Sequence, residues 1–589
     1  MKKYVSLVLF SLLSWAVCAT DFPKVILAGD YPDPTILRDG KDYYMTHSPF
    51  YYAPGFLIWH SQDLEHWEPV CRAMAQWEGS AMAPDLVKYN NRYYIYYPAA
   101  GTNWVIWADD IHGPWSAPKD LKVNGIDPGH VADADGKRYL YLSEGKVVQL
   151  SDDGLSTVGE VKKVYDGWPY PRNWRTEGMY LESPKLNYHN GYYYLTSAEG
   201  GTAGPGTSHM VVTARSKSVL GPWENSPFNP LVHTYSERES WWSRGHGTLI
   251  DDVNGNWWVV YHAYAKGYHT LGRQTLIEPI EWTPDGWCRA KSTGTFPKAE
   301  VPIRHGLELS GDFQGAEMGL QWTFWKEYAP KAVTLENRTL RLKAKGKTPA
   351  DGRLLLATAE DKNYETQVEV TVGKNNTAGL LLYYSEKAYA GLVSDGKTFT
   401  VYRHAGQKTE LPNTLGRQFT VRIKNQGNHV SISVGKDVKE WTTLAEGIDV
   451  SGMHHNAYKG FYALRIGLVS IGKGEAAFRR FRYKNAVPQE KDLSAYLMVF
   501  HKDETHGLYM ALSRDGYTFT ALNDGEPVLA GDTIAYQRGI RDPYIYRGPD
   551  GAFYLAMTDL HVFARRDGYR ETEWERDRNM YGWGNNKGL

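Results

Sequence analysis

The stretch that decides the fold is Arg38-Asp39-Gly40-Lys41-Asp42-Tyr43-Tyr44, a tight-turn signal that runs directly into an aromatic strand. Asp-Gly and Asn-Gly favour short hairpin turns, and tyrosine favours strands. Turns of this kind start at residues 39, 90, 135, 190 and 254, and each interval between them can hold one four-stranded sheet. The later copies are Asn90-Asn91-Arg92-Tyr93-Tyr94, Asp135-Gly136-Lys137-Arg138-Tyr139, Asn190-Gly191-Tyr192-Tyr193-Tyr194 and Asn254-Gly255-Asn256-Trp257-Trp258.

A second signature alternates with the first and supports the same repeat. It occurs as Ser61-Gln62-Asp63-Leu64-Glu65-His66-Trp67, Asp109-Asp110-Ile111-His112-Gly113-Pro114-Trp115 and Ser216-Lys217-Ser218-Val219-Leu220-Gly221-Pro222-Trp223. Regularly spaced turns and short strands, without long amphipathic helices, indicate radial repetition of small sheets. The chain is therefore predicted to be all-β, with a five-bladed β-propeller over about residues 22–300. A β-sandwich or β-helix is the structural alternative, but its spacing is usually shorter.

After Gly306 the residue pattern changes: apolar and polar residues alternate strictly in several segments. This alternation is typical of half-buried antiparallel strands. It predicts a concanavalin-like β-sandwich over about residues 306–485. The segments that carry it are Thr339-Leu340-Arg341-Leu342-Lys343-Ala344, Gln367-Val368-Glu369-Val370-Thr371-Val372, Phe419-Thr420-Val421-Arg422-Ile423 and His429-Val430-Ser431-Ile432-Ser433-Val434.

Residues 490–589 return to the pattern of the first half, in which a turn runs into an aromatic strand. Arg541-Asp542-Pro543-Tyr544 repeats the Asp-Pro step of Asp33-Pro34, and Asp550-Gly551-Ala552-Phe553-Tyr554 repeats the turn. This segment is predicted to be an incomplete second propeller. About 100 residues are too few to close a ring of such blades, and an unclosed ring leaves a sheet edge exposed. The chain is thus expected to be truncated at Leu589.

The N-terminus predicts export to the periplasm or the extracellular space. Met1-Lys2-Lys3, an apolar run and Val17-Cys18-Ala19 have the pattern of a signal peptide over residues 1–19. A lipoprotein signal at Cys18 is a weaker alternative, because Trp15-Ala16-Val17 is a poor match before a lipidated cysteine. No other apolar run is long enough to span a bilayer.

The composition gives three further observations, on net charge, on cysteines and on aromatic residues. With 66 Lys and Arg against 67 Asp and Glu, the net charge is -1, which favours neither nucleic acid nor an anionic membrane. After removal of a signal peptide, Cys71 and Cys288 remain, and the sequence leaves open whether they are free or bridged. Aromatic residues form 14% of the chain, which suits sheet packing and also stacking on sugar rings.

Three carboxylates stand at the starts of predicted repeats, each followed by proline within two residues. Asp33 precedes the first aromatic turn, Asp127 the third and Glu182 the fourth. Asp33 lies between two prolines, so its backbone is restricted on both sides. Equivalent places in a radial repeat predict that the three side chains converge on the propeller axis. Glycoside hydrolysis needs such paired carboxylates, one as base or nucleophile and one as acid.

Residues 22–485 resemble the glycoside hydrolases of family 43, the five-bladed β-xylosidases and α-L-arabinofuranosidases with an accessory β-sandwich. The resemblance rests on several motifs in the family's order. They are Tyr31-Pro32-Asp33-Pro34, Ile126-Asp127-Pro128, Glu182-Ser183-Pro184-Lys185-Leu186, Ala198-Glu199-Gly200-Gly201, Gly245-His246-Gly247 and Leu271-Gly272-Arg273-Gln274.

The resemblance implies a role for each carboxylate. Asp33 is the general base that activates water, Glu182 the general acid, and Asp127 the group that orients the acid and raises its pKa. The family inverts configuration, so Asp33 and Glu182 are expected to lie about 6.5–9.5 Å apart.

The resemblance also assigns residues around the sugar. Arg273 matches a substrate-contacting arginine and Phe50 an aromatic wall, although an ordinary core phenylalanine is an equal alternative for Phe50. His246 matches a central histidine beside an axial water or structural calcium, with a core histidine as alternative; no cofactor is expected to be required. Met82-Ala83-Pro84 departs from the family, where tryptophan often precedes Ala-Pro.

Four further carboxylates have other expected places. Glu177 is expected in a loop, with the pocket wall as the less favoured alternative. Asp85 and Glu199 are expected to be structural hydrogen-bond acceptors. Asp542 resembles Asp33 without its partners, and Arg541-Asp542-Pro543 is also similar to invertase-like propellers.

Together these features predict an exported, inverting glycoside hydrolase that releases terminal arabinofuranosyl or xylosyl residues from oligo- or polysaccharides of plant hemicellulose, such as xylan. The alternatives are a carbohydrate-binding propeller without catalysis, and a related propeller glycosidase or phosphorylase with a different sugar. The choice between the two pentoses depends on loop geometry, and oligomeric state is left open.

Overall fold

The structure is a computed structural model that describes residues 22–75, 78–301, 303, 305–485, 495–513, 518–548 and 552–562, with the backbone of 587–588. The chain forms two compact units, residues 1–486 and 487–589. The described residues are nearly all β, as predicted. The predicted signal peptide at 1–19, the Asp550-Gly551 turn and the end of the chain at Leu589 lie outside the described residues.

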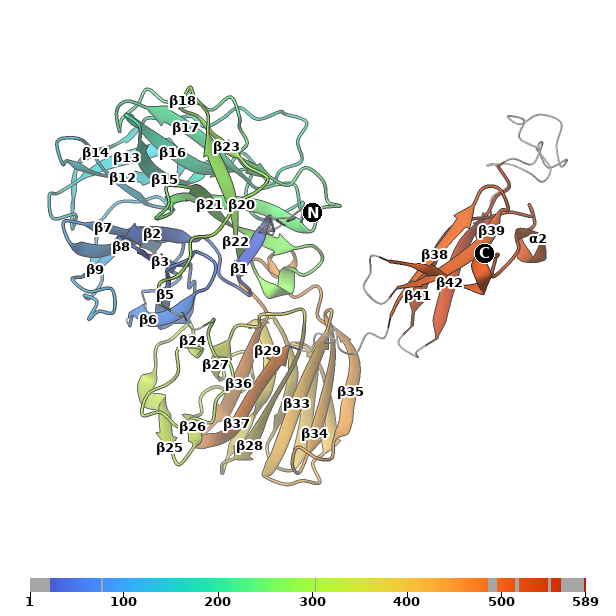
Figure 1. Cartoon of the computed structure of the whole chain (residues 1–589). Helices are drawn as coiled ribbons and strands as arrows, with labels where there is room; N and C mark the ends of the chain where they lie inside the picture. The colour runs from blue at the N-terminus through green and yellow to red at the C-terminus, as the bar shows by residue number, and fades with distance from the viewer. Residues whose placement is uncertain are drawn as a thin grey trace, which may run out of the picture. The chain divides into compact units, whose positions relative to one another are not determined.

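Over residues 22–301 the described strands form five small antiparallel sheets, drawn in blue to green in Figure 1. The first strand of each sheet contacts the first strands of the neighbouring sheets, and the ring closes where β20 meets β2. These sheets are the blades of the predicted five-bladed propeller. In order, they are β2 (Thr35–Asp39), β3 (Asp42–Thr46), β5 (Gly55–Ser61) and β6 (Glu68–Met74); β7 (Asp85–Tyr89), β8 (Arg92–Ala99), β9 (Thr102–Ala108) and β10 (Lys119–Asp120); β11 (Gly129–Ala132), β12 (Arg138–Leu142), β13 (Lys146–Leu150) and β14 (Thr157–Lys163); β15 (Glu182–His189), β16 (Tyr192–Glu199), β17 (Met210–Ser216) and β18 (Glu224–Asn225), with β19 (Val232–His233); and β20 (Trp241–Asp251), β21 (Trp257–Ala265), β22 (Gln274–Trp282) and β1 (Lys24–Leu27), with β23 (Cys288–Ala290).

The turn motif that predicted the repeat joins the first and second strands of every blade. In the second blade, for example, Asn90 and Asn91 have φ of 49° and 61°, the left-handed pair that a two-residue hairpin needs. Aromatic residues on the second strands then pack between blades; Tyr43, Tyr96 and Tyr194 are fully buried.

Closure of the ring comes from the N-terminal strand. β1 pairs antiparallel with β22, so the last blade is built from both ends of the propeller sequence (Figure 1). This pairing places the segment after β1, which carries Asp30 and Asp33, beside the residues that lead into β22.

A two-sheet sandwich follows over residues 323–485. β28 shows why these residues form it: Tyr364, Thr366, Val368 and Val370 are buried while the residues between them are not. The eight-stranded sheet is β32 (Gln407–Pro412), β31 (Thr398–His404), β30 (Ala388–Ser394), β29 (Asn376–Ser385), β36 (Arg465–Gly472), β27 (Arg353–Ala357), β24 (Thr323–Trp325) and β4 (Tyr52–Ala53), and the seven-stranded sheet is β25 (Val333–Glu336), β26 (Thr339–Lys343), β37 (Glu475–Asn485), β28 (Asn363–Val372), β33 (Gln418–Gln426), β34 (His429–Gly435) and β35 (Thr442–Asp449).

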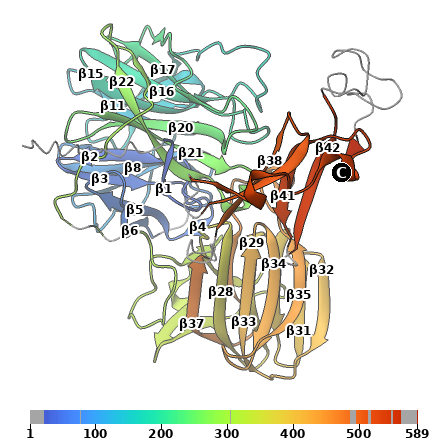
Figure 2. The same cartoon turned by 45° about the vertical axis from the view of Figure 1, so that its right-hand side comes forward.

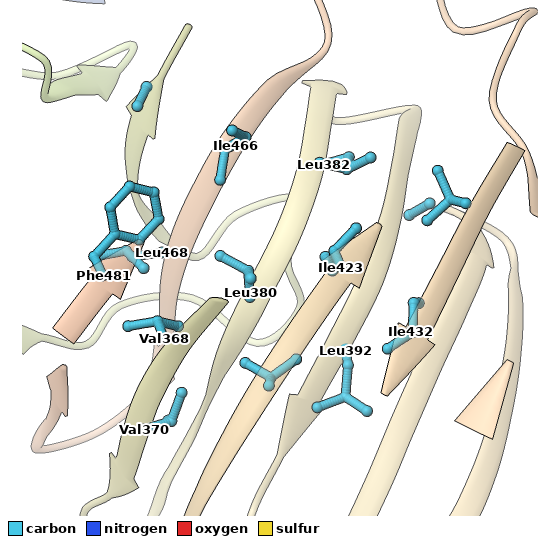
Figure 3. Packing of buried hydrophobic residues seen from close by; sticks show 14 of the residues in the cluster. Val368, Val370, Leu380, Leu382, Leu392, Ile423, Ile432, Ile466, Leu468 and Phe481 are labelled. Atoms are coloured by element: carbon cyan, nitrogen blue, oxygen red, sulfur yellow. The ribbon is translucent and has the colours of Figure 1, made fainter. Parts of the chain in front are cut away.

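Branched aliphatic side chains fill the space between these two sheets. Figure 3 shows Leu380, Leu382 and Leu392 from one sheet facing Val368 and Ile423 from the other. All five are fully buried. Burial of such side chains contributes about 1.5–3 kcal/mol each, so this core holds the sandwich together.

The propeller and the sandwich share secondary structure. β4, a short strand within the first blade, pairs with β24 at the edge of the eight-stranded sheet, where Ala53 lies opposite Phe324. A buried ion pair joins Asp30 before β2 to Arg465 of β36, with Nη2 and Oδ2 3.1 Å apart. The two domains therefore form a continuous unit.

The short helices are few in the described part of the chain. They comprise α1 (His455–Tyr458) and α2 (Gly531–Ile534), with the 3-10 turns η1 (Ser143–Gly145), η2 (His269–Leu271), η3 (Pro330–Ala332) and η5 (Asn523–Gly525). None of the helices among the described residues is long and apolar enough to cross a membrane. Cys71 and Cys288 are free thiols.

The second unit contains two small sheets of its own, in orange and red in Figure 2. Asp542 has φ of 48°, and its amide donates to Nδ1 of His501 at 3.2 Å, which repeats the backbone geometry of an Asp-Pro step in the first unit. The sheets consist of β38 (Tyr496–Lys502), β39 (Gly507–Ser513) and β40 (Thr520–Ala521), and of β41 (Ile540–Arg547), β42 (Phe553–Asp559) and β43 (Lys587–Gly588).

Candidate active site

A residue with left-handed backbone stands at the same place in each blade. These residues are Asp33, Ala83, Asp127, Ser183 and His246, with φ between 39° and 56°. Left-handed conformations of residues other than glycine are uncommon and cluster at functional sites. In four blades proline follows, and the register of the fourth and fifth blades shifts at this point. In four of the five blades the residue at this place, all but Ser183, lines one cavity.

Glu182 does not occupy that place. Its neighbour Ser183 does, so Glu182 is equivalent to Pro32, Met82, Ile126 and Gly245 in the other blades. The prediction of equivalent positions for all three carboxylates is therefore wrong in detail for Glu182. This preceding position also faces the cavity in two other blades, since Met82 and Ile126 line it, and Glu182 reaches the same cavity in the same way.

The predicted residues converge on a single cavity of 310 Å³. Its floor is buried, since Asp33, Asp127 and Arg273 are at most 4% exposed, whereas Tyr180 at the rim is 54% exposed. The lining residues are Asp33, Phe50, Met82, Ala83, Ile126, Asp127, Glu177, Tyr180, Glu182, Gly201, Thr202, His246, Arg273 and Phe461.

Asp33 is held by three hydrogen-bonding partners. Nη1 of Arg273 donates to Oδ1 at 2.8 Å, and Ser48 Oγ donates to Oδ2. The amide of Asp33 donates to Nδ1 of His262 at 3.1 Å, so the proton of that neutral ring lies on Nε2, which faces Thr202. Burial alone would raise the pKa of Asp33, but the Arg273 guanidinium, His246 and His262 together outweigh burial and hold the pKa well below its usual value. Asp33 is thus ionised and fixed in direction.

The pKa values of Asp127 and Glu182 are raised, in contrast to that of Asp33. Burial raises the pKa of Glu182 well above its usual value, and the charges of Asp127 and Asp33 raise it further. Burial and the charge of Asp33 also raise the pKa of Asp127, whose Oδ2 accepts from the amide of Ser183 at 3.0 Å. That bond ties Asp127 to the residue next to Glu182. The cavity therefore holds an ionised carboxylate, Asp33, and a protonated acid, Glu182.

Arg273 connects the carboxylates to the aromatic wall. Its guanidinium carbon lies 5.6 Å from the ring centre of Phe50 and 5.2 Å from that of Phe461, a cation–π arrangement on two rings. Phe50 thus lines the cavity, although it is also buried like a core residue. Phe461 belongs to the sandwich, in the loop between α1 and β36.

His246 lies on the cavity floor. Its Nδ1 is 3.4 Å from Oδ1 of Asp33 and 3.9 Å from Oδ2 of Asp127, and burial lowers the pKa of the ring well below its usual value. Nε2 is buried and has no protein partner among the described residues.

The cluster of Asp33, His246 and His262 does not fit a directly bound calcium ion, although their ligand atoms lie within 4.8 Å of one another. Calcium takes six to eight oxygen ligands, and here Asp33 is bonded to Arg273 while Nδ1 of His262 already accepts an amide proton.

A buried ion pair joins the second, third and fourth blades beside the cavity residues. Nζ of Lys185 donates to Oδ1 of Asp85 at 2.9 Å, and also to the carbonyls of Pro84 and Pro128. The second oxygen of Asp85 accepts from the amide of His130 at 2.6 Å. Asp85 is thus a structural acceptor, as predicted, and Glu199 likewise accepts from the amide of Trp168.

Sequence reasoning missed several residues of the site. Glu177 lies in a loop, as expected, and also lines the cavity, which was the less favoured alternative. Ser48, just after β3, and His262 in β21 gave no local signal, because a single serine or histidine is common at such places. Gly201 beside Glu199 was the available sign of a close approach, since an added Cβ there would lie 2.4 Å from Oε2 of Glu177. Phe461 comes from another domain, which no propeller motif could indicate.

Comparison with known proteins assigns the two domains of the first unit. The pattern described as "Glycosyl hydrolases family 43" matches residues 22–288. Residues 22–288 belong to glycosyl hydrolase family 43. The β-xylosidase C-terminal concanavalin A-like domain matches residues 310–484, and a "probable glycosyl hydrolase domain" matches residues 491–586 of this family 43 protein.

Curated relatives of this family 43 protein carry pentosidase names. It is 28% identical over 540 residues to a non-reducing end α-L-arabinofuranosidase of Bacteroides ovatus, which covers 81% of this chain and 97% of the relative. It is 29% identical over 435 residues to a xylan 1,3-β-xylosidase of a Vibrio species, covering 63% of this chain and 78% of the relative.

Solved structures similar to this chain include members of the same family and a xylosidase. A family 43 protein of Bacillus licheniformis matches with a TM-score of 0.71 and 27% identity, covering 79% of this chain and 100% of that chain. A xylan β-1,4-xylosidase of Bacillus halodurans matches with a TM-score of 0.71 and 26% identity over the same shares. The protein is a glycoside hydrolase with the family 43 propeller.

Proposed function

We propose that this glycoside hydrolase is exported, inverts configuration and releases terminal arabinofuranosyl or xylosyl residues from plant hemicellulose fragments. One observation carries the proposal: a single cavity holds an ionised Asp33 and a Glu182 whose pKa is raised by burial and by Asp127. A base and an acid kept in opposite protonation states are what single-displacement hydrolysis of a glycoside requires.

In the proposed reaction Asp33 takes a proton from the attacking water, and Glu182 gives its proton to the leaving oxygen. Asp127 keeps Glu182 protonated through its charge and orients it through Ser183. Arg273 keeps Asp33 ionised and presents its remaining donors to sugar hydroxyls. Inversion requires room for a water between the sugar and Asp33, and hence a carboxyl separation of about 6.5–9.5 Å.

The gradient of burial supports release of terminal residues. Asp33 and Arg273 lie on a buried floor, and the acid Glu182 lies nearer the exposed rim at Tyr180. The sandwich residue Phe461 covers part of the cavity. A sugar that enters with its chain end first would place its glycosidic oxygen beside Glu182. A cavity of 310 Å³ is at the small end for ligand sites, which suits one pentose.

Export rests on the first residues alone, Met1-Lys2-Lys3 and the apolar run to Ala19. The relatives' names support a pentose substrate, but they include both an arabinofuranosidase and a xylosidase. We therefore propose the pentose class and leave the ring form to experiment.

Hydrolysis of 4-nitrophenyl α-L-arabinofuranoside and β-D-xyloside tests the proposal directly. Glu182→Ala is expected to lower kcat/KM by about 100- to 10 000-fold on a natural disaccharide, with a smaller loss on the nitrophenyl substrates, which need less acid assistance. Glu160→Ala, an exposed glutamate on β14, is the matched control. Unchanged turnover in Glu182→Ala would refute the assignment.

Proton NMR of the first-formed sugar tests inversion. The opposite anomer from the substrate is expected, while retention would indicate a fructosidase-like double displacement and a requirement for phosphate would indicate a phosphorylase. Binding of glycans without hydrolysis by the unmodified protein would indicate a carbohydrate-binding propeller.

A further inference from the structure

The rim of the cavity beside the acid is built from the connection between β14 and β15. Glu177 and Tyr180 lie on this connection, five and two residues before Glu182, and both line the cavity. Both are exposed, in contrast to the buried floor. In a hydrolase whose acid protonates the leaving oxygen, the leaving group must lie on the side of the acid. Glu177 and Tyr180 therefore flank the path of the leaving group.

Glu177 is held in a fixed position despite its exposure. Its amide donates to the carbonyl of Gly200 at 3.0 Å and to Ser208 Oγ at 2.7 Å, and its Oε2 accepts from the amide of Ala203 at 2.9 Å. No described residue bonds Oε1. The carboxylate therefore has one oxygen anchored and one available to accept hydrogen bonds from a ligand.

Gly201 brings the two residues together. An added Cβ at Gly201 would lie 2.4 Å from Oε2 of Glu177 and 2.8 Å from the ring of Tyr180, so both side chains pack directly on this glycine. The ring of Tyr180 keeps much of its surface exposed, at 54% of the residue. An anchored carboxylate next to an exposed aromatic ring matches the polar edge and the apolar face of a sugar.

The sandwich holds this arrangement from the other side. The side chain of Asn456 in α1 accepts from the amide of Gly204 at 2.9 Å and donates to its carbonyl at 3.2 Å. Gly204 follows Ala203, which anchors Glu177. The loop that carries the anchor is thus fixed to a second domain, and the geometry of the rim does not depend on the propeller alone.

We propose that Glu177 and Tyr180 form a leaving-group subsite that binds a sugar, with hydroxyls donating to Oε1 of Glu177 and the ring stacking on Tyr180. The inference rests on the proposed function. It makes the two residues determinants of specificity: they would select glycosides whose leaving group is itself a sugar, and they would contribute little to alkyl or aryl glycosides of the same pentose.

The experiment compares three substrates that share one pentose: a disaccharide, the methyl glycoside and the 4-nitrophenyl glycoside. Glu177→Ala is expected to lower kcat/KM on the disaccharide by about 10- to 100-fold, as for loss of a hydrogen bond to a charged group. Tyr180→Ala is expected to lower it by about 3- to 10-fold. On the methyl and nitrophenyl glycosides both variants are expected to stay within about 2-fold of the unmodified enzyme.

The methyl glycoside separates binding from acid catalysis, because it needs a proton from Glu182 but offers no sugar hydroxyls. The charge of Glu177 contributes slightly to the raised pKa of Glu182, so a role exerted through the acid would slow the methyl glycoside as well. Equal losses on the methyl glycoside and the disaccharide, with a shifted alkaline limb, would overturn the subsite.

Matched controls are Glu160→Ala and Tyr188→Ala, an exposed glutamate and an exposed tyrosine outside the cavity. Glu177→Gln adds a test, because an amide oxygen still accepts hydrogen bonds and should recover part of the disaccharide activity. An unmodified enzyme that hydrolyses none of the three substrates would refute the proposed function. Hydrolysis with no preferential loss on the disaccharide in either variant would refute only the subsite.

Discussion

The guanidinium of Arg273 donates to Oδ1 of Asp33 at 2.8 Å, and 240 residues separate the two partners in sequence. Asp33 stands before the first strand of the first blade, and Arg273 stands before β22 in the last. The pairing of β1 with β22 brings them together, so closure of the propeller ring also completes this buried ion pair.

Replacement of Asp33 should abolish most of the activity. Asp33→Ala is expected to lower kcat/KM on nitrophenyl pentosides by about 100- to 10 000-fold, because it removes the proposed general base. Circular dichroism and thermal melting show whether the variant folds, since Arg273 would lose its buried partner. Asp135→Ala, in an exposed turn, is the control, and activity above a tenth of the unmodified level would contradict the role.

Asp127 should control the alkaline limb of the pH profile. The charge of Asp127 raises the pKa of Glu182, so Asp127→Asn lowers that pKa and Glu182 loses its proton at lower pH. The alkaline fall of kcat/KM is therefore expected to move to lower pH, while the acid limb changes little because Asp33 is ionised well below its usual range. An alkaline limb that stays in place or moves upward would argue against this coupling.

The ion pair between the propeller and the sandwich should matter for stability. Asp30→Ala leaves the buried guanidinium of Arg465, which also lies 3.5 Å from the ring centre of Tyr52, without its carboxylate. A loss of about 3–5 kcal/mol in the free energy of unfolding is expected in urea titrations followed by tryptophan fluorescence.

The exposed pair of Arg341 and Glu475 provides the control for this measurement. Glu475→Ala is expected to cost less than about 1 kcal/mol, because solvent screens an exposed pair. A similar small cost for Asp30→Ala would mean that the two domains do not depend on the buried pair.

Chelation should leave turnover unchanged. The carboxylate of Asp33 is bonded to Arg273, and His262 has no free lone pair on Nδ1, so the site does not need a cation to hold its base. After dialysis against EDTA, kcat and KM on a nitrophenyl pentoside are expected to match those before dialysis. Metal analysis of the untreated protein tests the predicted axial calcium at His246. Loss of activity that calcium restores would assign it a functional role.

Local sequence determined the propeller and most of the floor of its cavity. The five turns and their aromatic strands encode hairpins through neighbouring residues, and the Asp-Pro steps restrict the backbone at Asp33 and Asp127 in the same local way. For this reason the blades, the alternating strands of the sandwich and the convergence of Asp33, Asp127 and Glu182 could be predicted from the chain alone.

Only the tertiary structure decided how the cavity is completed. Phe461, Arg465 and Asn456 belong to the sandwich, and each contacts the propeller across more than 180 residues of sequence. The bulge beside Glu182 is likewise a feature of the pairing between β15 and β16. Such contacts follow from the packing of whole sheets and domains against one another, and no local pattern of side chains records which distant residues that packing brings together.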